Sequence, residues 1–175
     1  MKYYGGSGDD GKTLIGGKRI PKSDRRVIAI GELDDLSAKI GFAMSLITDE
    51  KLLSDLKSVE KDIYLISSEL SGYLNVVKSK TASMVSDSSV KRIEDLADYF
   101  SNEIKDITKF VYPNGTQAAT AVNMCRTQAR HAETALVSAD LGSPAVKAYI
   151  NRLSSLFFVL FRWLNQKAGF KEEFF

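Results

Sequence analysis

The chain of 175 residues is poor in the side chains that disulfides and iron sites require. Its one cysteine, Cys125, cannot form a disulfide within the chain, which is typical of a protein in a reducing compartment. Its one histidine, His131, cannot supply the paired Glu-x-x-His motifs of a di-iron helical bundle. The sequence therefore excludes a disulfide scaffold and a di-iron protein.

Long apolar runs and an excess of charge of one sign are also missing. The most apolar stretch, residues 153–164, contains Arg162 and is far too short to span a bilayer. Met1 is followed by polar and glycine residues rather than by the apolar run of a signal peptide. The formal net charge of +2 does not suggest a nucleic-acid binder. We therefore expect a cytoplasmic protein whose partners are neither membranes nor nucleic acids.

Basic residues are concentrated near the N-terminus, although the overall composition is ordinary. Hydrophobic residues make up 44% of the chain and charged residues 26%, as in soluble globular proteins. The length is that of one domain, so we expect residues 1–175 to form a single unit. The basic side chains of one short N-terminal stretch could meet an anionic ligand. They are Lys12, Lys18, Arg19, Lys22, Arg25 and Arg26.

Apolar residues recur at helical spacing in five segments after residue 22, which predicts five helices. Ser23 or Asp24, Asp49, Thr116 and Ser143 stand where they can cap the starts of four of them. No convincing strand pattern is present, so we expect an all-α, ferritin-like five-helix bundle over 23–170 and a glycine-rich loop over 1–22. The apolar stripes span residues 33–47, 52–77, 90–107, 118–136 and 146–164, with a polar loop over 79–89 and a break at 112–115.

Residues 6–13, GSGDDGKT, match the P-loop pattern G-x-x-x-x-G-K-[ST] in full. A P-loop needs a buried strand before it and a helix that starts at its lysine, and neither is indicated here. This context argues against a true P-loop. The glycine amides, Lys12 and Thr13 are nevertheless groups that can bind phosphate, so a P-loop-like nucleotide hydrolase stays as an alternative, beside a flexible tail.

Arg126, Arg130 and Glu133 recur at i, i+4 and i+7 and therefore share one face of the fourth expected helix. Two arginines at this spacing can clamp a polyphosphate, because each guanidinium offers a fork of donors. The alternative is a solvated helix face with an Arg–Glu pair. Cys125 belongs to the apolar stripe beside them, so we expect a buried structural thiol, whereas His131 is expected at the surface.

Six short motifs stand in order along nearly the whole chain. They are GDDGxT (8–13), GGKRxPK (16–22), GxxDDLxxxIG (31–41), FVxPxG (110–115), CRxxxRxAE (125–133) and YxNRLS (149–154). Together they resemble the signatures of the PduO-type ATP:cob(I)alamin adenosyltransferases. The resemblance implies a five-helix bundle that forms a homotrimer with its active sites between subunits. It implies transfer of the 5′-deoxyadenosyl group of ATP, with Mg²⁺, to a reduced corrinoid such as cobalamin.

The resemblance also implies roles for particular residues. Arg126 would pair with Asp34 of a neighbouring subunit, while Phe110, with Val111 beside it, would face the corrin and keep the lower axial ligand off the cobalt. A corrin reductase and an adenosylcobalamin-dependent enzyme would be partners. The residues that would contact ATP or its phosphates are Gly5, Gly6, Ser7, Gly8, Gly11, Lys12, Thr13, Lys22, Arg130, Glu133 and Asn151.

The chain departs from the family pattern at the nucleotide loop. Residues 5–7, Gly-Gly-Ser, stand where the family usually has Thr-Arg-Thr, so one arginine and one hydroxyl are missing. Lys12 stands where a small or hydroxylated residue is common and can restore the lost charge. Asp35 replaces a glutamate, and His131 and Thr134 replace arginines that often flank Glu133. These departures motivate a further alternative, a non-catalytic or corrinoid-binding helical bundle.

Overall fold

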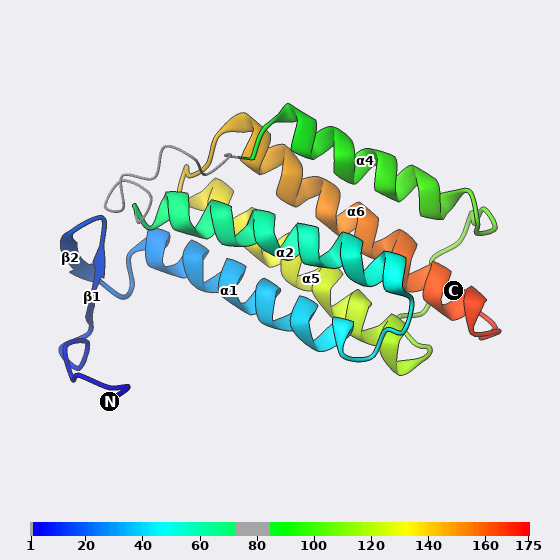
Figure 1. Cartoon of the computed structure of the whole chain (residues 1–175), viewed down its shortest axis with the longest axis horizontal. Helices are drawn as coiled ribbons and strands as arrows, with labels where there is room; N and C mark the ends of the chain where they lie inside the picture. The colour runs from blue at the N-terminus through cyan, green and yellow to red at the C-terminus, as the bar shows by residue number, and fades with distance from the viewer. Residues whose placement is uncertain (1, 73–84) are drawn as a thin grey trace.

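The computed structural model describes residues 2–72 and 85–175, and this part of the chain is mainly helical. Figure 1 shows long helices packed lengthwise, with a small hairpin and the N-terminus at one end. The five-helix expectation is confirmed for the described residues. The helices are α1 (Arg25–Met44), α2 (Glu50–Leu70), α4 (Asp87–Ser101), α5 (Gln117–Ser138) and α6 (Pro144–Lys167).

The starts of the helices are capped by residues that the sequence indicated. The side chain of Asp24 accepts a hydrogen bond from the amide of Arg26, and that of Asp49 accepts one from Leu52. Thr116 and Ser143 cap α5 and α6 in the same way. Each cap satisfies an amide that has no partner inside its helix. Local sequence therefore decides where these four helices begin.

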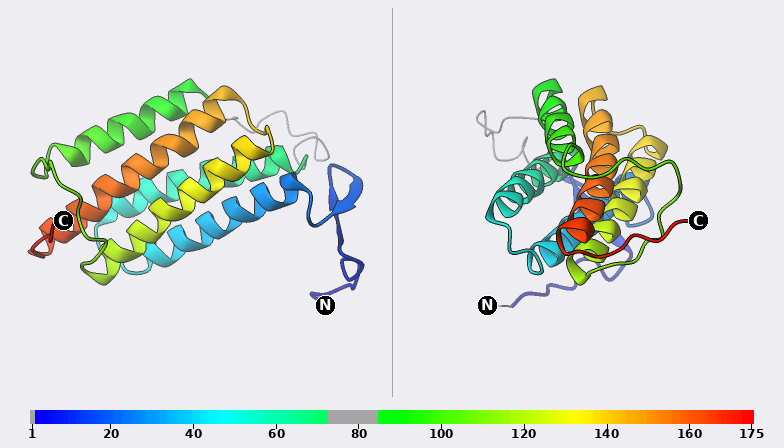
Figure 2. Two further views of the ribbon diagram at one scale, coloured as in Figure 1. Left: turned by 180° about the vertical axis from the view of Figure 1, so that it is seen from behind. Right: turned by 90° about the vertical axis from the view of Figure 1, so that its right-hand side faces the viewer.

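The bundle is a row of four helices with a fifth on one side. Seen from behind, α4, α6, α5 and α1 lie side by side in that order, and α2 packs on α1 (Figure 2). Helix α5 lies between α1 and α6, and its buried face includes several alanines, among them Ala119, Ala129 and Ala132. Small side chains let neighbouring helices approach closely. The apolar stripes of all five helices meet in one continuous core.

The expectation that the chain has no strand was wrong. Strands β1 (Lys12–Ile15) and β2 (Lys18–Pro21) form an antiparallel pair in which Ile15 pairs with Lys18. Gly16 and Gly17 join the strands with φ angles of 55° and 78°. A two-residue turn with two positive φ angles is the favoured hairpin connection, and a Gly-Gly pair is its sequence signal. The Gly-Gly signal was present, but each strand is only four residues long, so no strand pattern could be recognised in the sequence.

The third expected helix ends earlier in the chain than its apolar stripe predicted. Helix α4 ends at Ser101, so Ile104 and Ile107 lie in the irregular segment that follows it. Two residues of α6 hold this segment: the amide of Lys105 donates to Gln166, and the guanidinium of Arg162 donates to the carbonyl of Lys105. These contacts replace the helical hydrogen bonds. The expected stripe positions Leu74 and Val77, and most of the polar loop over 79–89, lie outside the described residues.

The ends of α6 agree with expectation, because it begins at Pro144 after the Ser143 cap and ends two residues before Gly169. Gly169 adopts a φ of 71°, the left-handed conformation that often ends a helix. None of the helices in the described ranges combines the length and the apolar character needed to cross a bilayer.

A buried amide fixes the segment that leads into α5. Asn165 of α6 has no exposed surface; its side-chain oxygen accepts from the amide of Thr116 at 3.0 Å, and its nitrogen donates to the carbonyl of Asn114 at 3.0 Å. Gly115 lies directly against this amide with a φ of 147°. A Cβ at Gly115 would overlap the Asn165 side chain, so only glycine fits here.

We expect Gly115→Ala to lower the free energy of unfolding by about 3 kcal/mol, because it combines backbone strain with overpacking against Asn165. Thermal and urea denaturation followed by circular dichroism would measure this. The control is Gly169→Ala, where φ is also positive but a Cβ meets nothing within 4 Å. The control substitution should lower the free energy of unfolding by about 1 kcal/mol. Equal losses in the two variants would contradict the role given to Asn165.

Candidate functional site

The glycine-rich N-terminal segment is folded onto the hairpin that follows it. Within the segment, the amide of Asp9 donates to the carbonyl of Gly6, and that of Gly11 to the carbonyl of Gly8. Arg19 of β2 donates to the carbonyl of Ser7 at 2.9 Å and to the carboxylate of Asp10 at 2.7 Å. The loop and the basic strand therefore form one unit, which sequence reasoning had described only as a loop.

This unit encloses a cavity of about 450 Å³ with a basic lining. The amide of Lys22 donates to the carbonyl of Gly11, which brings that lysine back over the loop. A Cβ at Gly8 would lie 3.1 Å from Nζ of Lys22, so the absence of a side chain at Gly8 lets the lysine ammonium group lie close to the loop backbone. Glycine backbone, cations and a hydroxyl around one space suit a polyphosphate. The lining residues are Ser7, Gly8, Lys12, Thr13, Leu14, Arg19 and Lys22.

Five of the residues expected to contact ATP therefore line this cavity, whereas Gly5, Gly6 and Gly11 lie in the loop but not in its lining. Arg19 was recognised only as part of a basic cluster and not as a site residue. Its partner Asp10 is nine positions away, but only the hairpin turn brings the two side chains together. Missing the hairpin is the reason why sequence reasoning missed Arg19.

The P-loop context is missing from the structure as well. Lys12 and Thr13 begin strand β1, whereas a P-loop requires a helix to start at these residues. The strands in the described part of the chain form a single two-stranded antiparallel sheet. Residues 6–13 therefore match the sequence pattern of a P-loop but do not have its geometry.

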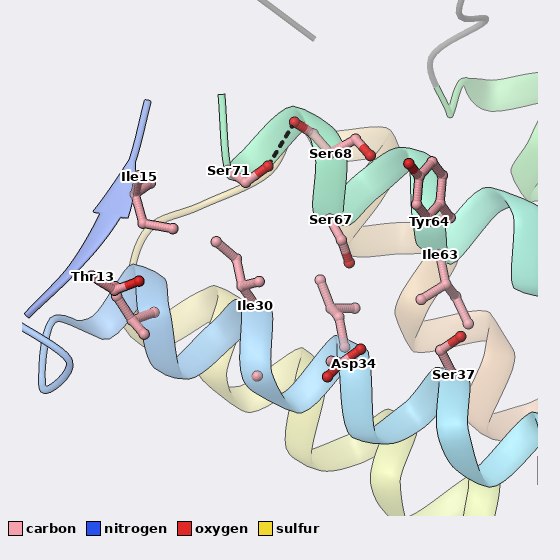
Figure 3. A pocket seen from close by; sticks show the side chains of 13 residues that line it. Thr13, Ile15, Ile30, Asp34, Ser37, Ile63, Tyr64, Ser67, Ser68 and Ser71 are labelled. Carbon is pink, nitrogen blue, oxygen red and sulfur yellow. Dashed lines mark hydrogen bonds between the residues drawn. The ribbon is translucent and has the colours of Figure 1, made fainter. Parts of the chain in front are cut away.

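The hairpin docks on the end of α2 through a close backbone contact. The amide of Gly16 donates to the carbonyl of Ser71 at 2.8 Å, and a Cβ at Gly72 would lie 2.8 Å from Cα of Gly16. Figure 3 shows the result: Thr13 and Ile15 of β1 face a second cavity, of about 500 Å³, between α1 and α2. Asp34 of α1 lies in this lining and its side chain is accessible to a ligand or to another subunit.

Arg126 and Arg130 lie on the outer face of α5 without a carboxylate partner in the described residues. Nε of Arg126 donates to the side-chain oxygen of Asn123 at 2.7 Å, and Arg130 is exposed. Burial lowers the pKa of Arg126, and the positive charge of Arg130 lowers it further. Two adjacent cations that lack an anion form a favourable place for a negatively charged ligand or an acidic side chain from another subunit.

Glu133 is bonded to α6 and not to the arginines of its own helix. Its carboxylate accepts from the amide of Asn151 at 2.8 Å, and the oxygen of Asn151 accepts from Arg152 at 2.7 Å. Arg152 in turn donates to Glu94 of α4 at 2.8 Å. The chain of contacts joins three helices and argues against the simple Arg–Glu surface pair. Glu94 was missed because nothing in its local sequence links it to residues 133–152.

A polar network between α1 and α5 sets how these two helices face one another. Gln128 is buried, and its amide nitrogen donates to Glu32 while its oxygen accepts from Lys39 at 2.6 Å. Lys39 also donates to Asp35 at 2.8 Å. Asp35, which stands where the family usually has a glutamate, therefore has an ion-pair partner within α1. The network holds the face of α1 that carries Glu32, Asp35 and Lys39 against α5, whereas Asp34 faces the cavity between α1 and α2.

The segment that carries Phe110 lies at the other end of the bundle. Residues 102–116 connect the end of α4 to the start of α5, at the opposite end from the hairpin (Figure 1). The side chain of Phe110 is 84% exposed, and Val111 is partly buried. One chain therefore does not bring Phe110 to the basic cavity. Within the residues described, Asp34 also forms no ion pair with Arg126.

The comparisons with known proteins identify the family. The family described as cobalamin adenosyltransferase matches residues 3–164. The chain belongs to this family. It is 32% identical over 173 residues to a cobalamin adenosyltransferase of Cupriavidus metallidurans, covering 93% of this chain and 88% of the relative. It is 30% identical to a corrinoid adenosyltransferase of Bacillus subtilis, covering 97% and 89%.

A solved structure agrees over the whole length. A variant of the PduO-type ATP:corrinoid adenosyltransferase from Lactobacillus reuteri, complexed with cobalamin and ATP, superposes with a TM-score of 0.88. The two chains are 28% identical, and the match covers 99% of each. The resemblance drawn from the six motifs is therefore confirmed, and so is the fold.

Cys125 has the surroundings of a structural thiol, as its position in the apolar stripe indicated. It is buried, and its thiol donates to the carbonyl of Ala121 at 3.4 Å. Burial raises the pKa of Cys125 to about 12, because the thiolate would lose its hydration. At neutral pH the side chain is therefore neutral and unsuited to nucleophilic chemistry. His131 is exposed, also as expected.

We expect Cys125 in the folded protein at pH 8 to react with an aromatic disulfide reagent at least roughly 100-fold more slowly than in denaturant. The elevated pKa keeps the thiol protonated until the chain unfolds, and burial blocks the reagent. Absorbance of the released thiolate gives both rates. The control is Lys57→Cys, at an exposed position of α2, which should react at once. Rapid reaction of Cys125 itself would contradict the structural role.

Proposed function

We propose that the chain transfers the 5′-deoxyadenosyl group of ATP to the cobalt of cob(I)alamin and releases triphosphate. The observation that carries the proposal is the basic cavity, where glycine backbone, Lys12, Lys22 and Arg19 surround one space in a member of this family. The complex of the Lactobacillus reuteri enzyme with cobalamin and ATP supports both substrates.

The reaction requires positioning and charge stabilisation more than acid–base chemistry. Cob(I)alamin is a strong nucleophile: its cobalt attacks C5′ of ATP, the Co–C bond forms, and the C5′–O bond breaks. The electron pair of that bond leaves with triphosphate, and the cobalt becomes formally Co(III). No residue has to act as a base. The protein has to align the two reactants and to stabilise the charge of the leaving group.

The basic side chains are suited to that charge. Lys12, Lys22 and Arg19 would bind the phosphates at the loop, and Arg130 would add its fork of donors from α5. Glu133 and Asn151 form a bonded pair that would hold the nucleoside part. No three His, Cys, Asp or Glu side chains gather as a metal site within residues 2–72 and 85–175. Mg²⁺ is proposed to bind the phosphates of ATP, where it would neutralise charge on the leaving group.

The active site is proposed to form between the subunits of a homotrimer. The basic cavity and the Phe110 segment lie at opposite ends of one bundle, so a second copy is needed to bring the two substrates together. Asp34 is exposed on α1, and Arg126 has no carboxylate partner among the described residues, so a pair between subunits would satisfy both charges. Phe110 and Val111 would contact the corrin. A corrin reductase, an adenosylcobalamin-dependent enzyme and a cytoplasmic location complete the proposal.

The activity is tested anaerobically with protein, Mg-ATP and chemically pre-reduced cobalamin. The expected result is a light-sensitive adenosyl-cobalt spectrum together with one triphosphate for each product. Release of ADP and phosphate without a corrinoid would favour the nucleotide hydrolase. Binding of both substrates without product would favour a non-catalytic relative, and either result would contradict the proposal.

We expect Arg130→Ala to lower the turnover rate by roughly 100- to 1,000-fold, because one preorganised charge on the leaving group is lost. The helical content should not change, since Arg130 is exposed on α5. Lys57→Ala removes an exposed positive charge from α2 and is the control for net charge. Turnover within about threefold of the unmodified chain would contradict the phosphate role of Arg130.

A further inference from the structure

We infer that the C-terminal segment Glu172–Phe175 is a positioning element that holds Phe110 in place for the corrinoid. The inference rests on the proposed function, in which Phe110 contacts the corrin. It assigns a task to residues that lie outside every motif of the sequence. Phe110 belongs to a segment without regular secondary structure, and its ring is 84% exposed. Its position must therefore be set through its backbone and its neighbours.

The tail pairs with the backbone on both sides of Val111. The amide of Tyr112 donates to the carbonyl of Glu173 at 2.9 Å, and the amide of Phe175 donates to the carbonyl of Phe110 at 3.0 Å. Val111 and Phe174 form the antiparallel bridge between these two bonds. A pair of bonds that flanks one residue fixes both the place and the direction of a short extended segment. The carbonyl of Phe110 itself is one of the bonded groups.

An aromatic stack reinforces the pairing. The rings of Tyr112 and Phe175 lie 3.8 Å apart between centroids with an angle of 24° between their planes. Stacked rings contribute beyond the area that they bury. Tyr112 is two positions from Phe110, on the same short segment. The stack therefore adds a side-chain contact to the two backbone hydrogen bonds.

The tail is itself anchored to α6 by a buried ion pair. The guanidinium of Arg162 donates to both oxygens of Glu172, at 2.9 and 3.0 Å, and the two side chains are 5% and 8% exposed. Arg162 also donates to the carbonyl of Lys105, which lies in the same segment as Phe110. A bidentate pair of this kind has a defined direction, unlike an exposed ion pair. Helix α6 thus fixes the tail, and the tail fixes Phe110.

The position of the tail predicts that its loss affects the corrinoid and not ATP. The tail and the Phe110 segment meet at the end of the bundle opposite the basic cavity. Loss of the tail should therefore impair what Phe110 does, which is to keep the lower axial ligand off Co(II) and so ease its reduction. It should leave ATP binding and the transfer from cobalt that is already Co(I) nearly unchanged.

The test uses a chain that ends after Glu173, so the Phe175 bond and stack are lost while the Glu172–Arg162 anchor stays. The rate of adenosylcobalamin formation is measured from Co(II) with a reductant and from pre-reduced Co(I). We expect the Co(II) route to slow about tenfold and the Co(I) route less than about twofold. Phe175→Ala should give a smaller loss of the same kind, because it keeps the backbone bond.

Electron paramagnetic resonance of bound Co(II) cobalamin, in the presence of Mg-ATP, supplies a readout besides rate. The nitrogen of a bound lower ligand splits the Co(II) signal, so the variant should retain more of the split form than the unmodified chain does. The matched control is Glu173→Ala, because Glu173 contributes only its backbone carbonyl and its side chain is exposed. This variant should behave as the unmodified chain.

The route of action is tested by combination with Phe110→Ala. If the tail acts through Phe110, truncation should cause no further slowing of the Co(II) route in the Phe110→Ala chain. Additive losses, or equal slowing of both routes, would overturn the inference and leave the tail a purely structural clamp. Unchanged rates and spectra in the truncated chain would overturn it too. An unmodified chain that makes no product from Co(I) would instead contradict the proposed function, and the inference with it.

Discussion

The structure depends on the burial of α5 between α1 and α6. The buried face of α5 includes several alanines that let both neighbours approach closely, and this close packing removes apolar surface from water along the bundle. The same helix carries the half-buried Arg126 and the exposed Arg130 on its other face. Because the small residues fix how α5 is rotated, the core also decides where these two charges point. The packing of one helix therefore decides both part of the core and the position of two surface charges.

Contacts between helices then turn a bundle into a site. Gln128 joins α5 to α1, and Asn151 joins α6 to Glu133 of α5, each through hydrogen bonds that are partly or fully shielded from water. Such bonds are strong where the surroundings are apolar, and they restrict the rotation of one helix against the next. Each places a charged side chain at a defined position on the surface without using a loop, which suits a reaction that depends on alignment.

The two ends of the bundle are supported by different contacts. At one end the hairpin docks on α2 through glycine backbone, with Gly16 and Gly72 in close contact. At the other end, the Phe110 segment is held by the buried amide of Asn165 and by the C-terminal tail. A single chain keeps the ends far apart. An active site that needs both is therefore a property of an assembly, which is the reason for proposing that subunits share it.

The sequence by itself determined the number of helices, the caps of four of them and the buried position of Cys125, because helical periodicity and capping depend on residues that are neighbours along the chain. It also indicated the family, since six motifs stand in order. Only the tertiary structure decided the end of α4, the partnership of Glu94 with Arg152, the hairpin that brings Arg19 to the loop, and the pairing of the tail with Phe110. Each depends on contacts between residues that are distant in sequence or on a turn joining very short strands. Periodicity carries no information about such pairings, because the free energy that selects them comes from burial and hydrogen bonds formed only after the helices have packed.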